Sequence, residues 1–458
     1  MRSSKAEIVD RVHKIPEIRF EDQRLTSYAG VVVLQALFSK LQLKSRLKAA
    51  FKHRQENPVF GHHLIVMILI VHFFLGYRRL RDIDYYRDDP MVLRLLGLKR
   101  LPDVATVSRR LATADAEAIA NVRHQCREMV LGRLQVLAVR RVTLDFDGSV
   151  IGSNRAAEGT AVGFNKRKKG QRSYYPLFCT VAQTGQVFDV LMRSGNVHDS
   201  NGAHDFILGC ISLVRSACPG IIIEVRMDSA FFSDEIVSEL DRQRVEFTIS
   251  VPFERFAELK GMIEGRRRWR VFNEVWSHFE AKWKPKKWDN CYRFIFVRQK
   301  VNKQHKEPVQ LDLFIPRQQD YQFSVIVTNK ATTMKKVMAF HHGRGSQEQT
   351  FGELKSQAQM DYIAVRRLNG NTLYLMSAVL THNLNRELQM ITQPQERNTT
   401  EKRAGLWIFR QLSTFRQTIL HRAGRLTSPQ GSLTLTMSRN QVAEEALLSY
   451  LVPLRDAA

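Results

Sequence analysis

The stretch from Phe340 to Lys355 holds side chains whose types and spacing could do chemistry on a nucleic acid. Within it, His341, Arg344, Glu348 and Lys355 follow one another at steps of three, four and seven residues. Because an α-helix turns by about 100° per residue, these steps return to one helix face. That face would carry a carboxylate flanked by two fixed cations and an imidazole. The pattern predicts a helix whose cationic side chains bind DNA phosphates while Glu348 binds a metal ion.

Two upstream aspartates could complete a metal site with this carboxylate. Asp147 and Asp228 each follow a mostly apolar, β-branched run, residues 142–146 and 221–227. In open α/β sheets ligands bind at the carboxyl ends of the strands, so both side chains are expected at one edge. Three carboxylates around two Mg²⁺ ions would form a site for in-line attack on a phosphodiester, and oxygen ligands suit Mg²⁺. The order of these acids is Asp, Asp, Glu.

With these residues in that order, the chain resembles the DDE transposases of bacterial insertion sequences, of the DDE domain group 1 type. That group has a β-rich insertion before the third acid and a Tyr-x2-Arg-x3-Glu-x6-Lys signature, and here His341 stands at the Tyr position. The resemblance covers about residues 140 to 390. The other matching pieces are Leu144–Ser149, Tyr175–Leu177, Arg193–His198, Arg226–Phe231 and Val327–Asn329.

This resemblance implies an α/β fold in which an RNase H-like catalytic core is interrupted by a β-rich insertion and preceded by a helical DNA-binding domain. Residues 1–140 would form a helical region for DNA binding and dimerisation, and residues 141–251 the first part of the core. Residues 252–335 would form the insertion, and residues 336–395 the part of the core with the catalytic Glu. Residues 396–458 would form a C-terminal region.

The same resemblance implies a transposase that binds terminal inverted repeats, cleaves DNA by two-metal hydrolysis and joins the 3′-OH ends to target DNA. Its cofactors would be two Mg²⁺ ions, for which Mn²⁺ can substitute. Its partners would be double-stranded DNA and a second copy of the chain in a synaptic complex. Two alternatives stay open at this point. One is an RNase H-like nuclease or resolvase without strand transfer, and the other is a domesticated DNA-binding protein.

Each predicted acid has a simpler structural explanation. Asp145 competes with Asp147, because residues two apart on a strand face the same side. We favour Asp147, since its Asp-Gly-Ser sequence resembles the tripeptide around the first acid of RNase H. Asp145 could then be a further metal ligand or could orient one. Asp228 could instead cap a following helix, and Glu348 could be a surface residue paired with Arg344. Glu353, one turn past Glu348, is the residue to test against it.

Composition points to a polyanionic partner. The chain has 458 residues, enough for several domains, and a formal net charge of +25. Lysine and arginine release condensed counterions when they bind DNA, so the excess fits a nucleic-acid partner. The five cysteines form no C-x2-C pair, which argues against structural zinc and a disulfide framework. The apolar run 64–75 falls short of the roughly 20 residues that span a bilayer. We therefore expect a cytoplasmic, nucleoid-associated protein without a membrane segment.

The helical region offers a candidate DNA-contact helix. Apolar spacing predicts helices over 28–51 and 64–77, the second of them buried. Pro102 and Asp103 are typical of a helix start, and Arg109 and Arg110 follow on that helix. The segment resembles the second helix of a helix-turn-helix, although a plain surface helix with two arginines explains it equally simply.

The core pattern alternates strands and helices. Strands are predicted at 142–146, 174–182, 187–192, 221–227 and 245–251, and helices at 203–214 and 233–242. Further strands are expected at 292–297 and 323–327 in the insertion, which should pack beside the active site, and near 432–437.

Two further groups could contact DNA. Lys166, Arg167, Lys168 and Lys169 form a basic run that is either a solvated turn or a clamp on phosphates. Trp283 and Trp288 lie among lysines of the insertion and could stack on a base flipped from the duplex, with core packing as the alternative.

Overall fold

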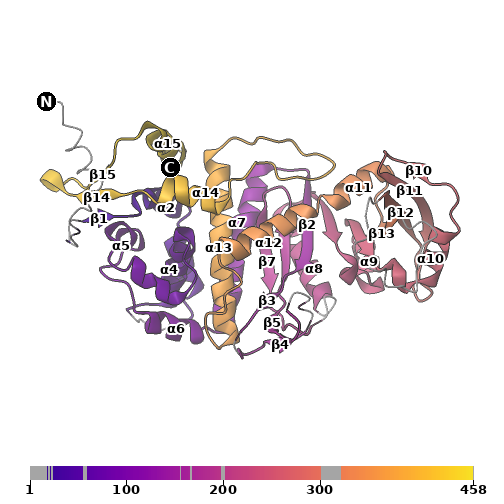
Figure 1. The fold of residues 1–458 in the computed structure, drawn as a ribbon, viewed down its shortest axis with the longest axis horizontal. Coiled ribbons are helices and arrows are strands. Elements are labelled where there is room, and N and C mark those ends of the chain that lie inside the picture. Colours follow the sequence, from indigo (N-terminus) through magenta and orange to yellow (C-terminus); the bar gives the residue numbers. More distant parts are fainter. Residues whose placement is uncertain are drawn as a thin grey trace, which may run out of the picture.

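The computed structural model describes residues 18, 21, 24–54, 59–154, 156–163, 165, 168–197, 202–300 and 321–456. The molecule is elongated, with helices near the N-terminus at one end, a sheet in the middle and a second group of strands at the other end (Figure 1). It is a mixed α/β protein built around a large mixed sheet, as predicted in outline.

Nine strands form the large sheet among the described residues, in the order β10-β11-β12-β13-β9-β8-β2-β6-β7. Strands β2, β8 and β9 run parallel to one another, whereas the neighbours on both sides are antiparallel. Their bounds are β2 Arg141–Gly148, β6 Leu177–Val181, β7 Gln186–Leu191, β8 Ile222–Met227, β9 Glu246–Val251, β10 Arg270–Val271, β11 Trp276–Trp283, β12 Tyr292–Lys300 and β13 Tyr321–Thr328. All the strands predicted between 142 and 251 are confirmed.

The strands after β9 continue the same sheet. β13 pairs antiparallel with β9, with Val327 opposite Ile249, and β12, β11 and β10 follow outward. A β-rich segment was predicted here, but the sequence pattern did not indicate that it would extend the core sheet. Extension covers the backbone groups that β9 would otherwise leave unpaired at an edge.

Helices cover the sheet and link it to the N-terminal helices. Long helix α13 contacts α4, α6, α7 and β7, so it joins the N-terminal helices to the sheet (Figure 1). The helices of this part are α7 Ala116–Leu137, α8 Ala203–Ala217, α9 Asp234–Arg242, α10 Ala257–Glu264, α11 Met334–His342, α12 Gly345–Ser356 and α13 Leu368–Thr392, with short turns η3 Ser229–Phe231 and η4 Phe253–Arg255. A small sheet, β3 Ile151–Gly152, β5 Arg172–Tyr174 and β4 Ala161–Val162, follows β2.

The N-terminal helices pack around α4, His62–Leu75. This helix is apolar on every side, and its residues from Ile65 to Leu75 are all buried, as the sequence predicted. The predicted helix over 28–51 is instead divided, because Gln42 adopts a left-handed conformation with φ of 50°. The other elements are β1 Leu25–Thr26, η1 Ala29–Val31, α2 Val32–Lys40, α3 Leu43–Ala50, η2 Leu80–Tyr85, α5 Pro90–Leu96 and α6 Val104–Ala112.

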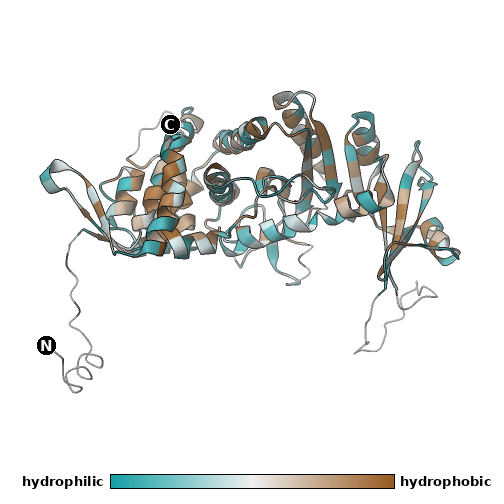
Figure 2. Ribbon diagram, turned by 90° about the horizontal axis from the view of Figure 1, so that it is seen from above, coloured by the Kyte–Doolittle hydropathy of each residue, from teal (hydrophilic) through white to brown (hydrophobic). Residues whose placement is uncertain are grey.

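The C-terminal segment returns to the N-terminal end. β14 pairs with β1 and β15, and α15 packs against α2 and α13. Its elements are α14 Leu412–Phe415, the π-helical turn η5 Arg416–Leu420, β14 Gly424–Thr427, η6 Pro429–Gly431, β15 Thr434–Met437 and α15 Gln441–Asp456. Figure 2 shows hydrophobic residues concentrated in the packed helices at this end and along the strands. The first and last described elements therefore share one core.

Candidate active site

Asp147 and Asp228 lie at the carboxyl ends of two neighbouring parallel strands. Phe146 of β2 is in register with Met227 of β8, so the next residues along, Asp147 and Asp228, come side by side. Asp228 caps the turn that follows, because its Oδ1 accepts a hydrogen bond from the Ala230 amide at 3.0 Å. Both aspartates are half-buried. The sheet thus brings together the two acids that the sequence predicted to meet.

Arg344 reaches this strand end from the helical segment 334–356. Its Nη1 donates to Asp147 Oδ2 at 3.0 Å, while Asp147 Oδ1 accepts the amide of Gly148 at 2.8 Å. The sequence predicted Arg344 as a contact to DNA phosphates, and in the structure its guanidinium pairs with the first acid. It directs one positive charge at the carboxylate where the sequence predicts metal binding.

The predicted single helix is divided into α11 and α12 at Gly343. A Cβ atom on Gly343 would lie 2.1 Å from Arg226 Nη1 and 2.0 Å from the Lys402 carbonyl oxygen, so only glycine fits. The division separates His341, in the last turn of α11, from Arg344 and Glu348.

His341 is buried between α11 and β9. Its ring nitrogens lie 3.0 Å from Thr248 Oγ1 and 2.9 Å from Ser250 Oγ. Burial, with the charges of Arg344, His342 and Arg226, lowers the pKa of His341 to about 3. This placement corrects the prediction that His341 donates to DNA, since a buried neutral imidazole is not available to a phosphate.

Glu348 lies on α12, one turn after Arg344, and is exposed. The residue before it, Gln347, is buried and donates from Nε2 to the Asp145 carbonyl oxygen at 2.9 Å. That bond fixes the first turn of α12 against β2, and so keeps Glu348 at the same edge as Asp147. Lys355 lies in the last turn of α12 and is half-buried.

Asp145 has a different environment from Asp147. It is 1% exposed, and both its carboxylate oxygens accept from Arg226, at 2.5 Å from Nε and 2.7 Å from Nη2. Arg226 is itself fully buried and also donates to the carbonyl oxygens of Phe340 and Lys402, each at 2.9 Å. Asp145 is therefore bound on both oxygens by a side chain of the neighbouring strand.

Glu353, the competitor of Glu348, is buried and structural. It forms an ion pair with Arg386 of α13, and its Oε1 accepts the Leu412 amide at 3.1 Å. These contacts tie α12 to α13 and to α14. Glu348 is the acid of α12 that faces solvent near the strand ends.

Of the residues predicted to contact DNA outside this site, some are exposed on the surface and others are packed in the core. Arg109 is exposed on α6, Arg110 is half-buried, and Lys168 and Lys169 are exposed. Asp103 caps α6 as predicted, accepting the Thr106 amide at 2.6 Å. Lys166 and Arg167 lie outside the described residues.

The two tryptophans pack in the protein. Trp288 is 8% exposed, and its ring centroid lies 4.8 Å from that of Phe232. This burial corrects the prediction that Trp288 stacks on a base. Trp283 is half-buried, with its ring edge-on to Phe256 and Phe294.

Sequence reasoning missed Arg226 and Gln347, which hold the site together without belonging to the acidic set. Arg226 stands two residues before Asp228 in the Arg-Met-Asp piece, where its charge within an apolar strand was the available signal. Nothing in the sequence around Gln347 distinguishes it from a surface residue of the helix.

The oxygen donors suit a hard divalent cation, but they are not gathered into one cluster. Among the described residues, no three His, Cys, Asp or Glu side chains lie together in a group that could hold a metal ion. Asp147 and Asp228 are neighbours, whereas Glu348 is directed to solvent. A metal ion held by all three would require Glu348 to move towards the strand ends.

The chain thus combines strand-end carboxylates beside Arg344 with a formal net charge of +25. The family model described as Transposase DDE domain group 1 matches residues 11–458. The chain belongs to this family and is a DNA transposase, an enzyme that cleaves and joins DNA. Transposases of the DDE class generally use divalent metal ions.

Comparison with solved structures gives weaker likenesses. A piggyBac transposase synaptic complex with hairpin DNA is 11% identical, with a TM-score of 0.44 over 86% of this chain and 80% of the other. A Mos1 transposase paired-end complex with left transposon end is 10% identical, with a TM-score of 0.18 over 51% of this chain and 60% of the other. A Mos1 mariner paired-end complex with Mn is 10% identical, with a TM-score of 0.18 over 42% and 60% of the two chains. No curated protein sequence matches the chain.

None of the described helices combines the length and the apolar character that crossing a bilayer requires.

Proposed function

We propose that Asp147, Asp228 and Glu348 carry the cleavage and joining reactions of this transposase. The observation that supports this best is the register of β2 and β8, which sets Asp147 beside Asp228, together with the Arg344 contact that brings α12 to Asp147. The three carboxylates would hold two divalent cations, Mg²⁺ or Mn²⁺ in its place. Bound there, such ions stabilise the attacking and leaving oxygens of an in-line displacement.

Arg344 has two roles in this proposal. In the structure its guanidinium balances the charge of Asp147. For Asp147 to serve as a metal ligand, Arg344 must release Oδ2 and turn to another anion. A DNA phosphate arriving at the strand ends is the natural partner, because a guanidinium binds phosphate oxygens with paired hydrogen bonds. Lys355, two turns past Glu348 on α12, would hold a neighbouring phosphate. The exposed side chain of Glu348 is then free to approach Asp147 and Asp228.

The central part of the sheet supports an RNase H-like core. The order β7-β6-β2-β8-β9, with β2, β8 and β9 parallel and β6 and β7 antiparallel, is the order that this core requires. Asp147 ends the central strand β2, and Asp228 ends the strand next to it. Bidentate pairing of Asp145 with Arg226 supports Asp147 as the first acid, and leaves Asp145 the role of fixing β2.

Around this core we propose the domain division stated above, with residues 1–140 binding DNA through α6, residues 252–335 as the insertion, and residues 396–458 as the C-terminal region. Exposed Arg109 supports the contact by α6, and exposed Lys168 and Lys169 support one by the turn before β5. We further propose recognition of terminal inverted repeats, a homodimer in the synaptic complex, and an origin in a bacterial insertion sequence with action at the nucleoid.

Excision from a plasmid tests the proposed site. The plasmid would carry a marker between the two terminal repeats, and reactions would contain Mg²⁺, Mn²⁺ or EDTA. The wild type is expected to release the marker only with a metal, and Asp228→Asn is expected to bind the ends without cutting. Asp205→Asn removes a carboxylate from the exposed first turn of α8 and is the matched control. Normal excision by Asp228→Asn would remove this residue from the site, and excision without joined products would favour a nuclease.

A further inference from the structure

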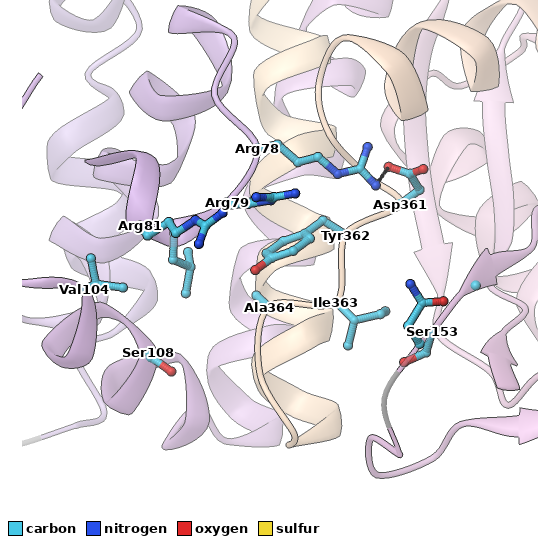
Figure 3. A pocket seen from close by; sticks show the side chains of 13 residues that line it. Arg78, Arg79, Arg81, Val104, Ser108, Ser153, Asp361, Tyr362, Ile363 and Ala364 are labelled. Carbon is cyan, nitrogen blue, oxygen red and sulfur yellow. Dashed lines mark ion pairs between the residues drawn. The ribbon is translucent and has the colours of Figure 1, made fainter. Parts of the chain in front are cut away.

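A cavity of about 550 Å³ lies between the N-terminal helices and the sheet, away from the three acids. Its walls come from three separate segments, which Figure 3 shows converging. The segment around η2 contributes arginines, α6 contributes Val104 and Ser108, and the core contributes residues of β3 and of the loop before α13. No predicted site residue lines it.

The cavity is positively charged and carries hydrogen-bond donors. Arg78, Arg79 and Arg81 line it, and Asp361 is the acid among the lining residues. Asp361 Oδ1 lies 3.0 Å from Arg78 Nη2, so this acid balances one of the three charges. Arg79 and Arg81 are exposed and form no ion pair with a described residue. Two guanidinium groups are therefore available to an anion.

The local fold fixes the backbone that carries Arg79 and Arg81. Asp82 accepts the backbone amide of Arg79 at 2.8 Å, which orders the start of η2. Buried Leu80 and Ile83 anchor η2 in the core, so that the residues between and before them face outward. Across the cavity, Ser108, Ser153 and Asn154 add hydroxyl and amide groups. Paired guanidinium groups with neutral donors opposite are the chemistry that binds a phosphate.

In the proposed function, DNA contacts both α6 and the strand-end acids, and the cavity lies between these two places. Its α6 wall belongs to the helix that carries exposed Arg109. On the other side, Ser153 follows Asp147 by six residues. Because an extended chain spans at most about 3.5 Å per residue, Ser153 lies within about 20 Å of Asp147. At about 3.4 Å per nucleotide along one strand, that is a reach of about six nucleotides.

We propose that this cavity binds a backbone phosphate of the element-end DNA, close to the cleaved bond, through Arg79 and Arg81. The inference rests on the proposed function, since it takes the cleaved DNA to run from α6 to the strand ends. Such a contact positions the duplex without reading its sequence. A phosphate held here would fix the distance between the helix that contacts the ends and the carboxylates that cut.

The test measures binding of a labelled element-end duplex over a range of salt concentrations. Arg79→Gln/Arg81→Gln is compared with Arg94→Gln, an exposed arginine of α5 outside the cavity. Each lost phosphate contact lowers the slope of log affinity against log salt by about 0.9. The double variant is expected to lose about one such contact and to bind all sequences more weakly. Arg94→Gln is expected to keep the wild-type slope.

A scan with single neutral methylphosphonates then locates the contact. One position close to the cut should weaken wild-type binding and have no effect on the double variant. A wild-type slope and an unchanged scan in the double variant would overturn the proposal. Calorimetry with inorganic phosphate at constant ionic strength tests whether the ligand of the cavity is a free anion. Phosphate binding that the variant loses, with DNA binding unaltered, would also overturn it. Failure of the wild type to bind or cut the duplex would count against the proposed function instead.

Discussion

Strands β2 and β8 carry carboxylates in their interior and at their ends. The interior carboxylates are buried and paired with cations, whereas the carboxylates at the strand ends are half-buried. In the interior, Asp145 is 1% exposed and Glu224 is fully buried. Asp145 has both oxygens bound by Arg226, and Glu224 pairs with Lys330 at 2.6 Å and with Arg403 at 2.7 Å. At the ends, Asp147 and Asp228 are half-buried, with backbone amides among their donors.

The difference shows how acids of similar sequence context acquire different roles. A carboxylate removed from water needs fixed cations, because an unpaired buried charge is costly. Once it is bound on both oxygens it cannot readily exchange its partner for a metal ion. A half-exposed carboxylate at a strand end has water nearby and can exchange partners at lower cost. The interior acids therefore fix the strands, and the strand-end acids are available for chemistry.

The interior pairs also attach distant segments to the sheet. Glu224 binds Arg403 from the C-terminal segment and Lys330 from the loop after β13. Arg226 binds the Lys402 carbonyl oxygen next to Arg403. The C-terminal segment is thus attached to β8, and Arg226 also links it to α11 through the Phe340 carbonyl oxygen.

The largest expected contrast is between Asp145→Asn and Asp147→Asn. Asp145→Asn leaves Arg226 buried without its counter-charge, and breaking such a pair costs about 3–5 kcal/mol of folding free energy. Asp147→Asn breaks a contact in which Arg344 is 22% exposed, so we expect a cost of no more than about 1 kcal/mol. The order should be reversed for the cleavage rate, which should fall more in Asp147→Asn than in Asp145→Asn. We expect a loss of about 10³-fold or more for Asp147→Asn. Urea unfolding and Mg²⁺-dependent excision measure the two effects.

A double variant separates charge from packing in this comparison. Asp145→Leu/Arg226→Met removes both buried charges, and replacing a buried pair by apolar groups is often close to neutral. It should regain much of the stability lost by Asp145→Asn. Equal stability of Asp145→Asn and Asp147→Asn would show that the interior and the strand end do not differ in the way described.

Acid unfolding tests the interior at Glu224. Burial raises the pKa of this carboxyl, but hydrogen bonds and charges from Arg403 and Lys330 outweigh burial and bring the pKa to about 2. An unfolded glutamate titrates near 4.5, so the unfolded chain binds the extra proton between these values. Stability from Glu224 is complete above about pH 4.5 and is lost as the pH falls towards 2. The full effect is about 3 kcal/mol.

Glu224→Gln is the variant for this measurement. It should be less stable than the wild type at pH 7, and the difference should shrink as the pH falls from about 5 to 3. Glu348→Gln removes an exposed carboxylate and is the matched control. A wild-type acid profile for Glu224→Gln would show that the interior pairing does not depend on the charge of this residue.

Much of the sheet could be predicted from sequence because its strands are short, apolar and β-branched. The runs ending at Asp147 and Asp228 became β2 and β8, and the turn 183–186 became the hairpin between β6 and β7. Apolar character on every side of α4 likewise predicted a buried helix. In each case the local pattern and the burial that it requires agree.

The features that were not predicted depend on contacts between distant segments. Helical spacing alone set His341 on the same face as Glu348, but the spacing does not show that Arg226 and Lys402 occupy the space beside Gly343, where the helix divides and a side chain would not fit. Pairing of β13 with β9 and the cavity beside Arg79 also need the tertiary fold. No local spacing rule contains this information.

The smallest expected effect lies at the boundary between the two regions, where His341 faces the interior and Arg344, three residues later, faces the strand end. The folded pKa of His341 is about 3, against an ordinary value of 6.5, so the unfolded chain binds more protons between these values. Stability from the neutral imidazole is complete above about pH 6.5 and falls as the pH is lowered, by about 2 kcal/mol at pH 5. Other buried histidines add to the wild-type slope, so His341→Gln should reduce that slope by one proton without abolishing it. His204→Gln, on the surface of α8, is the matched control. An unchanged slope for His341→Gln in urea unfolding between pH 7 and 5 would mean that this ring is accessible to protons, and would return it to the candidates for contact with DNA.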